Sequence, residues 1–218
     1  MMKIRIVYFA YLAPGAWRPV VLEQLNALKA LALYGSSTIH MSVVSNDAEL
    51  AGLREMLARD YPEITLANVF QENVFEYPGI KTVWEAAQES DPDTIILYFH
   101  SKGMTSGEHD ARRKLFTWTI ENHYYYAKAF ENDPRLDIGC LMPHVEGFAY
   151  FNFFWVRAGY VKAHCPKPEI SADRYVWETW LKPIDAHVPK VFSPMGLVMH
   201  GKFPLVNIRV LQILNGLK

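Results

Sequence analysis

The sequence has little of what would place it in a specialised structural class. Its two cysteines, Cys140 and Cys165, show no CxxC spacing, so we expect buried thiols in a reducing compartment and no disulfide framework. Basic and acidic residues nearly cancel, 22 against 23, which argues against nucleic acid as a partner and against a disordered acidic tail. The chain also lacks the GxGxxG and GxxxxGK[ST] sequences. These absences argue against a dehydrogenase or a P-loop nucleotide hydrolase.

The N-terminal segment MMKIRIVYFAYLAP contains a short apolar run that ends at Pro14. The run is too short to span a bilayer, and it lacks the small-residue cleavage site of a signal peptide. We therefore expect a first strand there, no transmembrane segment, and a cytoplasmic protein.

Apolar residues, in contrast, make up 50% of the 218 residues, enough to fill the core of one sizeable domain. In the first half, β-branched runs typical of strands alternate with helical patterns. The alternation predicts an α/β fold with a doubly wound, mostly parallel sheet flanked by helices. The expected strands are residues 4–9, 37–45, 63–70 and 93–100, and the expected helices are residues 20–33, 48–60 and 79–90.

The second half is less regular, but no repeat or linker divides the chain, so we expect a single domain over residues 1–218. Its patterns predict three further helices and three further strands. The helices are expected at residues 110–134, 171–181 (capped by Ser171) and 206–218, and the strands at residues 137–143, 149–161 and from residue 190.

The fourth predicted strand, apolar on both faces as a central strand is, ends at once in His100, Ser101 and Lys102. In an open α/β sheet, ligands bind beyond the carboxyl ends of the strands, so this triplet is a candidate binding site. Gly103 would let the backbone turn sharply beside a ligand. The alternative is structural, with His100 hydrogen-bonded to a neighbouring carbonyl and Lys102 solvated.

Several segments together resemble the nucleotide-sugar glycosyltransferases of the GT-A fold. They are the first loop FAYLAP, the strand that ends in HSK, the aromatic segment GFAYFNFFWVRAGYV and the acidic segment SADRYVWETWL. EYPGIKTVWEAA with YFHSKGMT is similar to glycosyltransferase domains of large algal DNA viruses and some bacteria. The resemblance covers about residues 1–205. It implies a nucleotide-binding half, about residues 1–107, and an acceptor-binding half, about residues 108–205.

The activity that the resemblance implies is transfer of a hexose or deoxyhexose from a nucleotide-diphosphate sugar to a hydroxyl of a glycan or glycoprotein, with inversion. The alternative is a catalytically inactive module that binds a sugar or nucleotide sugar within a larger assembly. It stays open because the usual Asp-x-Asp pair of the fold is missing from the strand end.

The donor nucleoside is expected beside the first two strands. The resemblance places Ala10 and Tyr11, and Asn46 and Asp47, against the base and the ribose, where Tyr11 can stack on the ring. Helix capping explains Asn46 and Asp47 equally well. Lys81 is implied as a further donor contact, and a solvated helix charge is its alternative.

In enzymes of this fold, the Asp-x-Asp pair holds a divalent metal on the donor diphosphate. Here His100, Ser101 and Lys102 stand in its place, and a lysine ammonium offsets diphosphate charge without an ion. Mn²⁺ or Mg²⁺ and metal independence both stay open. The Asp91-Pro92-Asp93 sequence precedes the strand, so we expect a turn at the opposite edge of the sheet.

The late segment VMHGKFP is similar to the loop of GT-A enzymes that reaches the metal or the diphosphate. The resemblance implies that His200 and Lys202 contact the diphosphate and that His200 and His100 hold a metal if one binds. An ordinary surface loop is the alternative.

An inverting transfer needs a carboxylate that removes the proton from the acceptor hydroxyl. The resemblance points to Asp173, and Glu146 is the second candidate; helix-start electrostatics also explains Asp173. Implied acceptor contacts are Asn152, Trp155 and Arg113. The alternation around Trp155 is equally typical of a strand with a buried face.

Overall fold

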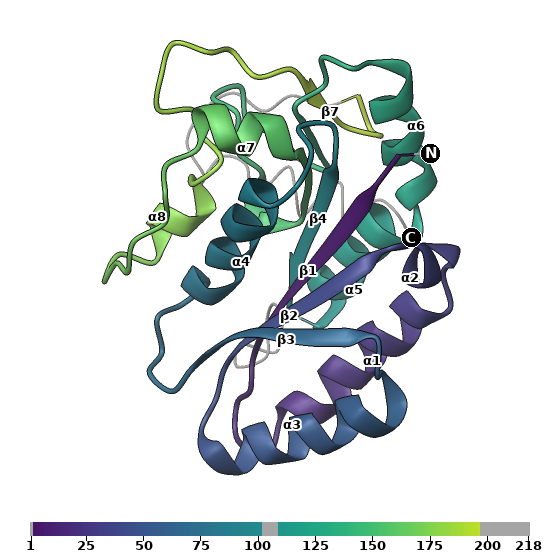
Figure 1. The fold of residues 1–218 in the computed structure, drawn as a ribbon, viewed down its shortest axis with the longest axis vertical. Coiled ribbons are helices and arrows are strands. Elements are labelled where there is room, and N and C mark those ends of the chain that lie inside the picture. Colours follow the sequence, from purple (N-terminus) through teal and green to yellow (C-terminus); the bar gives the residue numbers. More distant parts are fainter. Residues whose placement is uncertain (1, 102–108, 197–218) are drawn as a thin grey trace.

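The computed structural model describes residues 2–101 and 109–196. Their strands form a seven-stranded sheet in the order β3-β2-β1-β4-β6-β5-β7, with helices on both faces (Figure 1). The neighbours β3, β2, β1 and β4 pair in parallel, and β6 is antiparallel to both β4 and β5. The predicted α/β fold with a mostly parallel, helix-flanked sheet is confirmed.

The first half follows the predicted alternation, except that an extended residue, Leu31, divides the first expected helix into two. The strand β4 is buried at every position, as its apolar composition predicts for the middle of the sheet. The strands are β1 (Ile4–Tyr11), β2 (Thr38–Val44), β3 (Ile64–Phe70) and β4 (Ile95–His100), and the helices are α1 (Trp17–Lys29), α2 (Ala32–Ser36), α3 (Asp47–Asp60) and α4 (Tyr77–Gln88).

The second half departs more from its prediction. The expected long helix is interrupted by a wide π-turn, the expected aromatic strand is reduced to four residues between two helical segments, and the helix expected to be capped by Ser171 is a single turn. The elements are α5 (His109–Phe116), the π-turn η1 (Thr117–Glu121), α6 (His123–Asn132), β5 (Ile138–Cys140), the 3₁₀ turn η2 (Tyr150–Asn152), β6 (Phe154–Arg157), α7 (Ala158–His164), α8 (Tyr175–Glu178) and β7 (Val191–Phe192). The expected helix over residues 206–218 lies outside the described residues.

The π-turn has an identifiable partner in the sheet. The indole Nε1 of Trp155, on β6, donates a 2.9 Å hydrogen bond to the carbonyl oxygen of Thr119 in η1. At the end of the turn, the backbone N–H of Asn122 bonds the carbonyl of Thr117, five residues back. The π-turn thus provides a backbone carbonyl as hydrogen-bond acceptor for the buried indole N–H of Trp155.

The helices α4 and α7 lie on one face of the sheet, and α1 and α5 lie on the other (Figure 1). The approach of α4 is close because residue 79 is glycine. A Cβ atom at Gly79 would lie 2.6 Å from Cβ of Phe9 and 2.7 Å from the hydroxyl oxygen of Tyr98. The absence of a side chain therefore sets the distance between α4 and the centre of the sheet.

Both cysteines are buried, as their number and spacing predict, and burial raises the pKa of each thiol far above its usual range.

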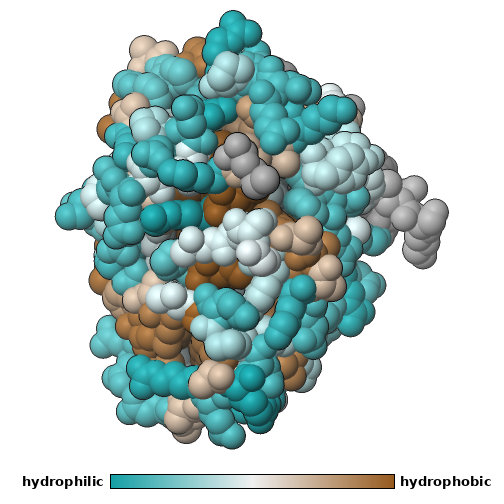
Figure 2. Space-filling model, turned by 45° about the vertical axis from the view of Figure 1, so that its right-hand side comes forward, coloured by the Kyte–Doolittle hydropathy of each residue, from teal (hydrophilic) through white to brown (hydrophobic). Residues whose placement is uncertain are grey.

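Among the described residues, every helix is too short or too polar to span a membrane. On the face seen in Figure 2, apolar residues show mainly in recesses between hydrophilic side chains.

We predict that Gly79→Ala lowers the free energy of unfolding by about 1–3 kcal/mol, because the added methyl group overpacks the contact of α4 with the sheet. Urea denaturation measures the change. Gly35→Ala is the matched control, since a Cβ there meets nothing within 4 Å. Equal stability of the two variants would contradict the packing argument.

Candidate functional site

The carboxyl ends of four parallel strands lie side by side. The strands β1, β2, β3 and β4 end at Tyr11, Val44, Phe70 and His100. Hydrogen bonds continue just past these ends: Ser45 N–H donates to the carbonyl of Phe70 at 2.8 Å. Because strand ends in such a sheet bound the ligand crevice, we take this edge as the candidate functional site.

Ser101 ties the end of β4 to the end of β1. Its N–H donates to the carbonyl of Phe9 at 2.9 Å, and its Oγ accepts a 3.1 Å hydrogen bond from the N–H of Tyr11. Ser101 is 6% exposed, whereas Tyr11 is half-buried. Ser101 therefore fixes the backbone of the predicted nucleoside contact Tyr11.

His100 turns inward at the strand end. Its Nε2 lies 2.9 Å from the carbonyl oxygen of Phe151, and its ring packs on Phe153 at a centroid distance of 5.2 Å. A carbonyl only accepts, so Nε2 carries the proton of this bond and is not available to ligate a metal. The predicted metal role of His100 therefore does not fit at Nε2, and the structural alternative, a histidine bonded to a nearby carbonyl, is observed.

The sequence analysis missed Glu76, whose carboxylate lies next to the imidazole of His100. Glu76 is the N-cap residue of α4, and its Oε1 lies 3.8 Å from Nε2 of His100. Its Oε2 accepts hydrogen bonds from Nδ2 of Asn152 at 2.8 Å and from the hydroxyl of Tyr98 at 3.3 Å. A carboxylate directly before a helix that has proline in its first turn was the available signal.

The hydroxyl of Tyr98 stays protonated in this cluster. Burial raises its pKa far above the usual value, and the neighbouring Glu76 carboxylate raises the pKa further. Tyr98 is therefore a hydrogen-bond donor to Glu76 at neutral pH.

From the other face of the sheet, Gln24 of α1 holds the same strand end. It accepts a 2.7 Å hydrogen bond from the hydroxyl of Tyr8, and its Nε2 donates to the carbonyl of His100 at 3.3 Å. Gln24 is 3% exposed. Both faces of the sheet thus fix the backbone that precedes Lys102.

The predicted nucleoside residues lie at the ends of β1 and β2. Asn46 caps α3 by accepting a 2.9 Å bond from the N–H of Glu49, so its capping alternative is observed. Asp47 is exposed and accepts a 2.8 Å bond from Nε2 of Gln71, just past β3. Ala10 is completely buried, so its methyl group presents no exposed surface at the strand end.

Lys81 lies on α4 and is engaged by its neighbours. Its Nζ is 2.6 Å from Oε1 of Glu85 and 2.7 Å from Oδ1 of Asn68 on β3. The ion pair with Glu85 follows the i,i+4 spacing of a helix. The alternative reading of Lys81 as a helix-surface charge matches this geometry.

The two carboxylate candidates are both accessible. Asp173 is exposed, and its Oδ1 accepts a 2.9 Å bond from the N–H of Tyr175 at the start of α8. Glu146 lies in the loop after β5, 3.1 Å from Nζ of Lys182. Asp173 thus acts as a helix-start acceptor, and Glu146 as half of a surface ion pair.

The predicted acceptor residues fall in three different environments. Trp155 is fully buried with its N–H bonded to Thr119, so the prediction that it contacts an acceptor is corrected: it is a core residue. Asn152 is 2% exposed and bridges Glu76 to the carbonyl of Trp177, which lies 3.1 Å from its Nδ2. Arg113 is paired with Glu23 of α1 at 2.6 Å.

The described residues contain no group of three or more histidine, cysteine, aspartate or glutamate side chains that could hold a metal. Lys102, His200 and Lys202, which carry the predicted diphosphate contacts and the second metal ligand, lie outside the described residues. Among the described residues, the side chains at the strand ends therefore do not form a set of ligands for Mn²⁺ or Mg²⁺.

The literal Asp-x-Asp sequence lies at the opposite edge, as expected. Asp91 pairs with Lys3 at 2.6 Å and accepts a turn hydrogen bond from the N–H of Thr94, and Asp93 pairs with Arg157 at 3.2 Å. Both acids precede β4, so they lie away from the strand ends.

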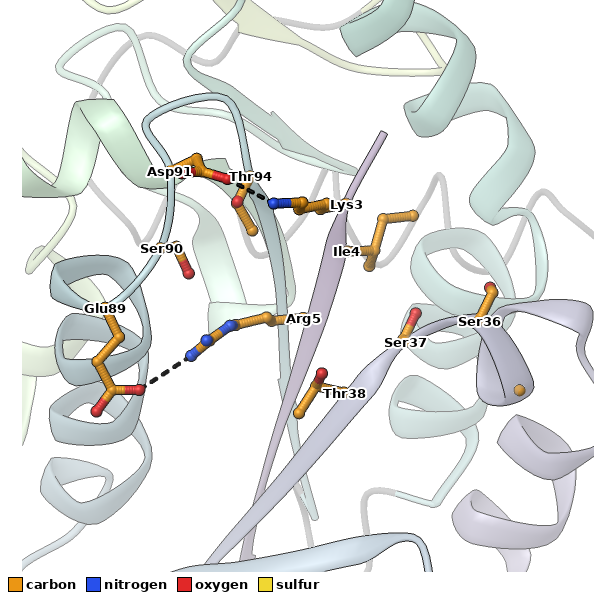
Figure 3. Close-up of a pocket in the computed structure, with 11 residues that line it drawn as sticks. Lys3, Ile4, Arg5, Ser36, Ser37, Thr38, Glu89, Ser90, Asp91 and Thr94 are labelled. Atoms are coloured by element: carbon orange, nitrogen blue, oxygen red, sulfur yellow. Dashed lines mark hydrogen bonds and ion pairs between the residues drawn. The ribbon is translucent and has the colours of Figure 1, made fainter. Parts of the chain in front are cut away.

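A hollow of about 620 Å³ lies at this amino edge (Figure 3). Two ion pairs line it, Lys3 with Asp91 and Arg5 with Glu89, the latter at 3.2 Å. The cations here already face carboxylates, so the hollow offers no excess charge to a phosphate. It is distinct from the candidate site.

No family model and no curated protein matches the chain. Two solved structures that resemble it are a mannosyltransferase from Pyrobaculum calidifontis, in complex with GDP-Man and Mn²⁺ (10% identity, TM-score 0.53), and TarS from S. aureus (12% identity, TM-score 0.50). The matches cover 90% and 88% of this chain, but only 55% and 35% of the respective proteins.

At these identities the likeness shows the fold alone. The sheet and its flanking helices match the GT-A-like fold of nucleotide-sugar transferases, which agrees with the fold that the sequence resemblance implied. The chain spans about half the length of the mannosyltransferase and about a third of TarS. The activity therefore has to be argued from the site.

We predict that Glu23→Gln lowers the free energy of unfolding by about 0.5 kcal/mol at pH 7, because Glu23 pairs with the exposed Arg113 and with the buried Arg112. The hydrogen bond from Arg113 holds the pKa of Glu23 below its usual value. A depressed carboxyl pKa adds stability above the unfolded-state pKa and loses it as pH falls. The difference between variant and wild type should be complete above about pH 4, the unfolded-state value, and should shrink as pH falls below it; a difference that does not change with pH would contradict the pairing.

Proposed function

We propose that the protein is a glycosyltransferase that moves a sugar from a nucleotide-diphosphate sugar to a hydroxyl of a glycan or glycoprotein, with inversion. The narrower resemblance, to glycosyltransferase domains of large algal DNA viruses and some bacteria, rests on the sequence motifs alone. The proposed cytoplasmic location rests on the cysteine content and the N-terminal segment of the sequence. The division into a nucleotide-binding half and an acceptor-binding half belongs to the same proposal.

The observation that carries the proposal is the row of polar strand ends at the carboxyl edge of a GT-A-like sheet. Tyr11, Asp47 and Ser101 come from three parallel strands or the residues just past them. This is where open α/β sheets bind ligands, and a nucleotide needs both a ring-stacking surface and polar partners. The half-buried ring of Tyr11 and the carboxylate of Asp47 are of these types.

We assign the diphosphate to cationic side chains after β4 and in the late loop. Lys102 follows the fixed strand end directly, and His200 and Lys202 are the further candidates from the sequence. An ammonium group is a sufficient counter-charge for a departing diphosphate, so no step of the proposed reaction needs a metal. The Mn²⁺ in the complex of the mannosyltransferase makes a metal the competing arrangement to test.

We assign the base to Asp173, with Glu146 as the second candidate. The carboxylate takes the proton of the acceptor hydroxyl, the hydroxyl oxygen forms its bond to the anomeric carbon, and the bond from that carbon to the diphosphate oxygen breaks with its electron pair leaving on the diphosphate. Asp173 is exposed, so an acceptor can reach it, and it lies just before α8. Asn152 bonds both Trp177 in α8 and Glu76, which lies beside His100 at the end of β4.

The first test is a thermal-shift panel of UDP-, GDP-, dTDP- and CMP-sugars, each with and without Mn²⁺. A ligand at 100 times its dissociation constant stabilises the native state by about 2.7 kcal/mol, so we expect one nucleotide family to raise the melting temperature. A response that needs Mn²⁺ would replace the lysine assignment by a metal. Flat curves for a folded protein would contradict donor binding, and a glycan array would then test the alternative of a sugar-binding module.

Asp173→Asn tests the base. The amide oxygen of asparagine can still accept the hydrogen bond from Tyr175, so the start of α8 is kept while the basic group is lost. We expect turnover to fall by about 100-fold or more, with donor affinity unchanged. Glu146→Gln is the matched comparison, because it removes the other accessible carboxylate; if it alone abolishes turnover, the base is Glu146.

A further inference from the structure

The Glu76 carboxylate contacts residues from two other elements. It accepts hydrogen bonds from the amide of Asn152 in η2 and from the hydroxyl of Tyr98 in β4, and the imidazole of His100, also in β4, lies 3.8 Å away. Tyr98 is fully buried, Asn152 is 2% exposed and the Glu76 side chain is 21% exposed. The cluster therefore joins α4, β4 and η2 in a largely dry region at the edge of the candidate site.

The chemistry of the cluster requires a carboxylate. Two donors bond Oε2 of Glu76, the amide NH₂ of Asn152 and the phenol of Tyr98, which burial keeps protonated. Oε1 lies 3.8 Å from Nε2 of His100, whose proton goes to the carbonyl of Phe151. A glutamine that keeps its oxygen toward Asn152 and Tyr98 turns its NH₂ toward Nε2–H of His100, which places donor beside donor and removes the charge of the acceptor. Leaving a buried donor unsatisfied costs about 1–3 kcal/mol.

The backbone around the cluster is held in a conformation that these residues rarely adopt. In the described residues, the non-glycine residues with positive φ are Phe75 (55°), Phe151 (67°) and Asn152 (51°). Phe75 directly precedes Glu76, the carbonyl of Phe151 bonds His100, and the side chain of Asn152 bonds Glu76. Left-handed backbone costs a phenylalanine about 1–2 kcal/mol, so the contacts of the cluster have to offset this cost at Phe75 and Phe151.

The cluster also extends toward the proposed base. Nδ2 of Asn152 donates a second hydrogen bond, 3.1 Å long, to the carbonyl of Trp177 in α8. Trp177 is 2% exposed and its ring packs on Tyr77, the first residue of α4, at a centroid distance of 5.5 Å. A single amide thus connects Glu76 to the short helix α8, whose first N–H bonds Asp173.

We propose that Glu76 is a positioning residue: it holds the 150–152 turn against the end of β4 and, through Asn152, fixes α8 and the Asp173 carboxylate relative to the strand ends. This inference rests on the proposed function for its catalytic consequence and on the geometry alone for its structural one. Glu76 acts on the reaction through Asn152, because its Oε2 accepts the hydrogen bonds from Asn152 and Tyr98 and its Oε1 faces His100.

The structural consequence is tested by hydrogen exchange, which needs no substrate. In Glu76→Gln we expect amide exchange over residues 148–154 and 175–178 to be at least tenfold faster than in the wild type, with β1 and β2 unchanged. Glu85→Gln is the matched control: the same substitution on the same helix, where the carboxylate pairs with Lys81 outside the cluster. The same exchange pattern in both variants would overturn the inference.

The catalytic consequence is read as a split between binding and turnover. In Glu76→Gln we expect the donor dissociation constant to stay within threefold of the wild type while kcat falls at least tenfold, since the strand ends remain and only the base is displaced. Loss of donor affinity in proportion to kcat would indicate general disruption of the fold and overturn the positioning role.

Asn152→Gly is the second variant, and it protects the test against misfolding of the first. Glycine adopts positive φ without strain, so this variant removes the amide while relieving the backbone. We expect its kcat to fall as in Glu76→Gln and the double variant to be no worse than either single one, because both act through the same link. Additive losses would overturn the inference. A flat donor panel with the expected exchange pattern would contradict the proposed function and leave the role of Glu76 in the turn supported.

Discussion

The parallel pairing of β1 with both β2 and β4 is the constraint on which the rest of the structure depends. It aligns the carboxyl ends of the central strands, so that residues distant in sequence, such as Tyr11 and Ser101, become hydrogen-bonded neighbours. Parallel pairing is stable only when helices cover both faces, and the close approach of α4 at Gly79 provides that cover on one side. A polar site at the strand ends follows from this arrangement, because the buried backbone groups there have to find partners beyond the ladder.

The fold was predictable where one residue pattern dominates. The buried run of β4 and the alternation of strands with amphipathic helices led to the correct sheet class, and capping of α3 by Asn46 was one of the alternatives that the sequence left open. The second half was not predictable in detail, because tertiary contacts decide it. The π-turn is bonded to the sheet by Trp155 and Thr119, which are 36 residues apart, and the left-handed backbone at Phe151 has no local signature.

The strand ends that form the candidate site were predictable from the sequence, and the contacts of their side chains were less so. The sequence located the strand end at His100, but whether an imidazole faces a ligand or a carbonyl depends on what the fold brings beside it. Here that neighbour is η2, 51 residues away. Glu76 escaped notice for the same reason: a glutamate at a helix start is common, and its partners Tyr98 and Asn152 are brought together only by the sheet. The predicted contacts Lys102, His200 and Lys202 lie outside the described residues and stay predictions.

Because both thiols are buried, the rate at which they are chemically modified measures how often the folded chain opens. Alkylating reagents react with the thiolate, and Cys140 on β5 and Cys165 at the end of α7 are shielded from solvent and kept protonated. Modification therefore has to wait for the structure around each thiol to open. The modification rate at neutral pH therefore measures how often the structure around β5 and α7 opens locally. A melting curve reports only the unfolding of the whole protein.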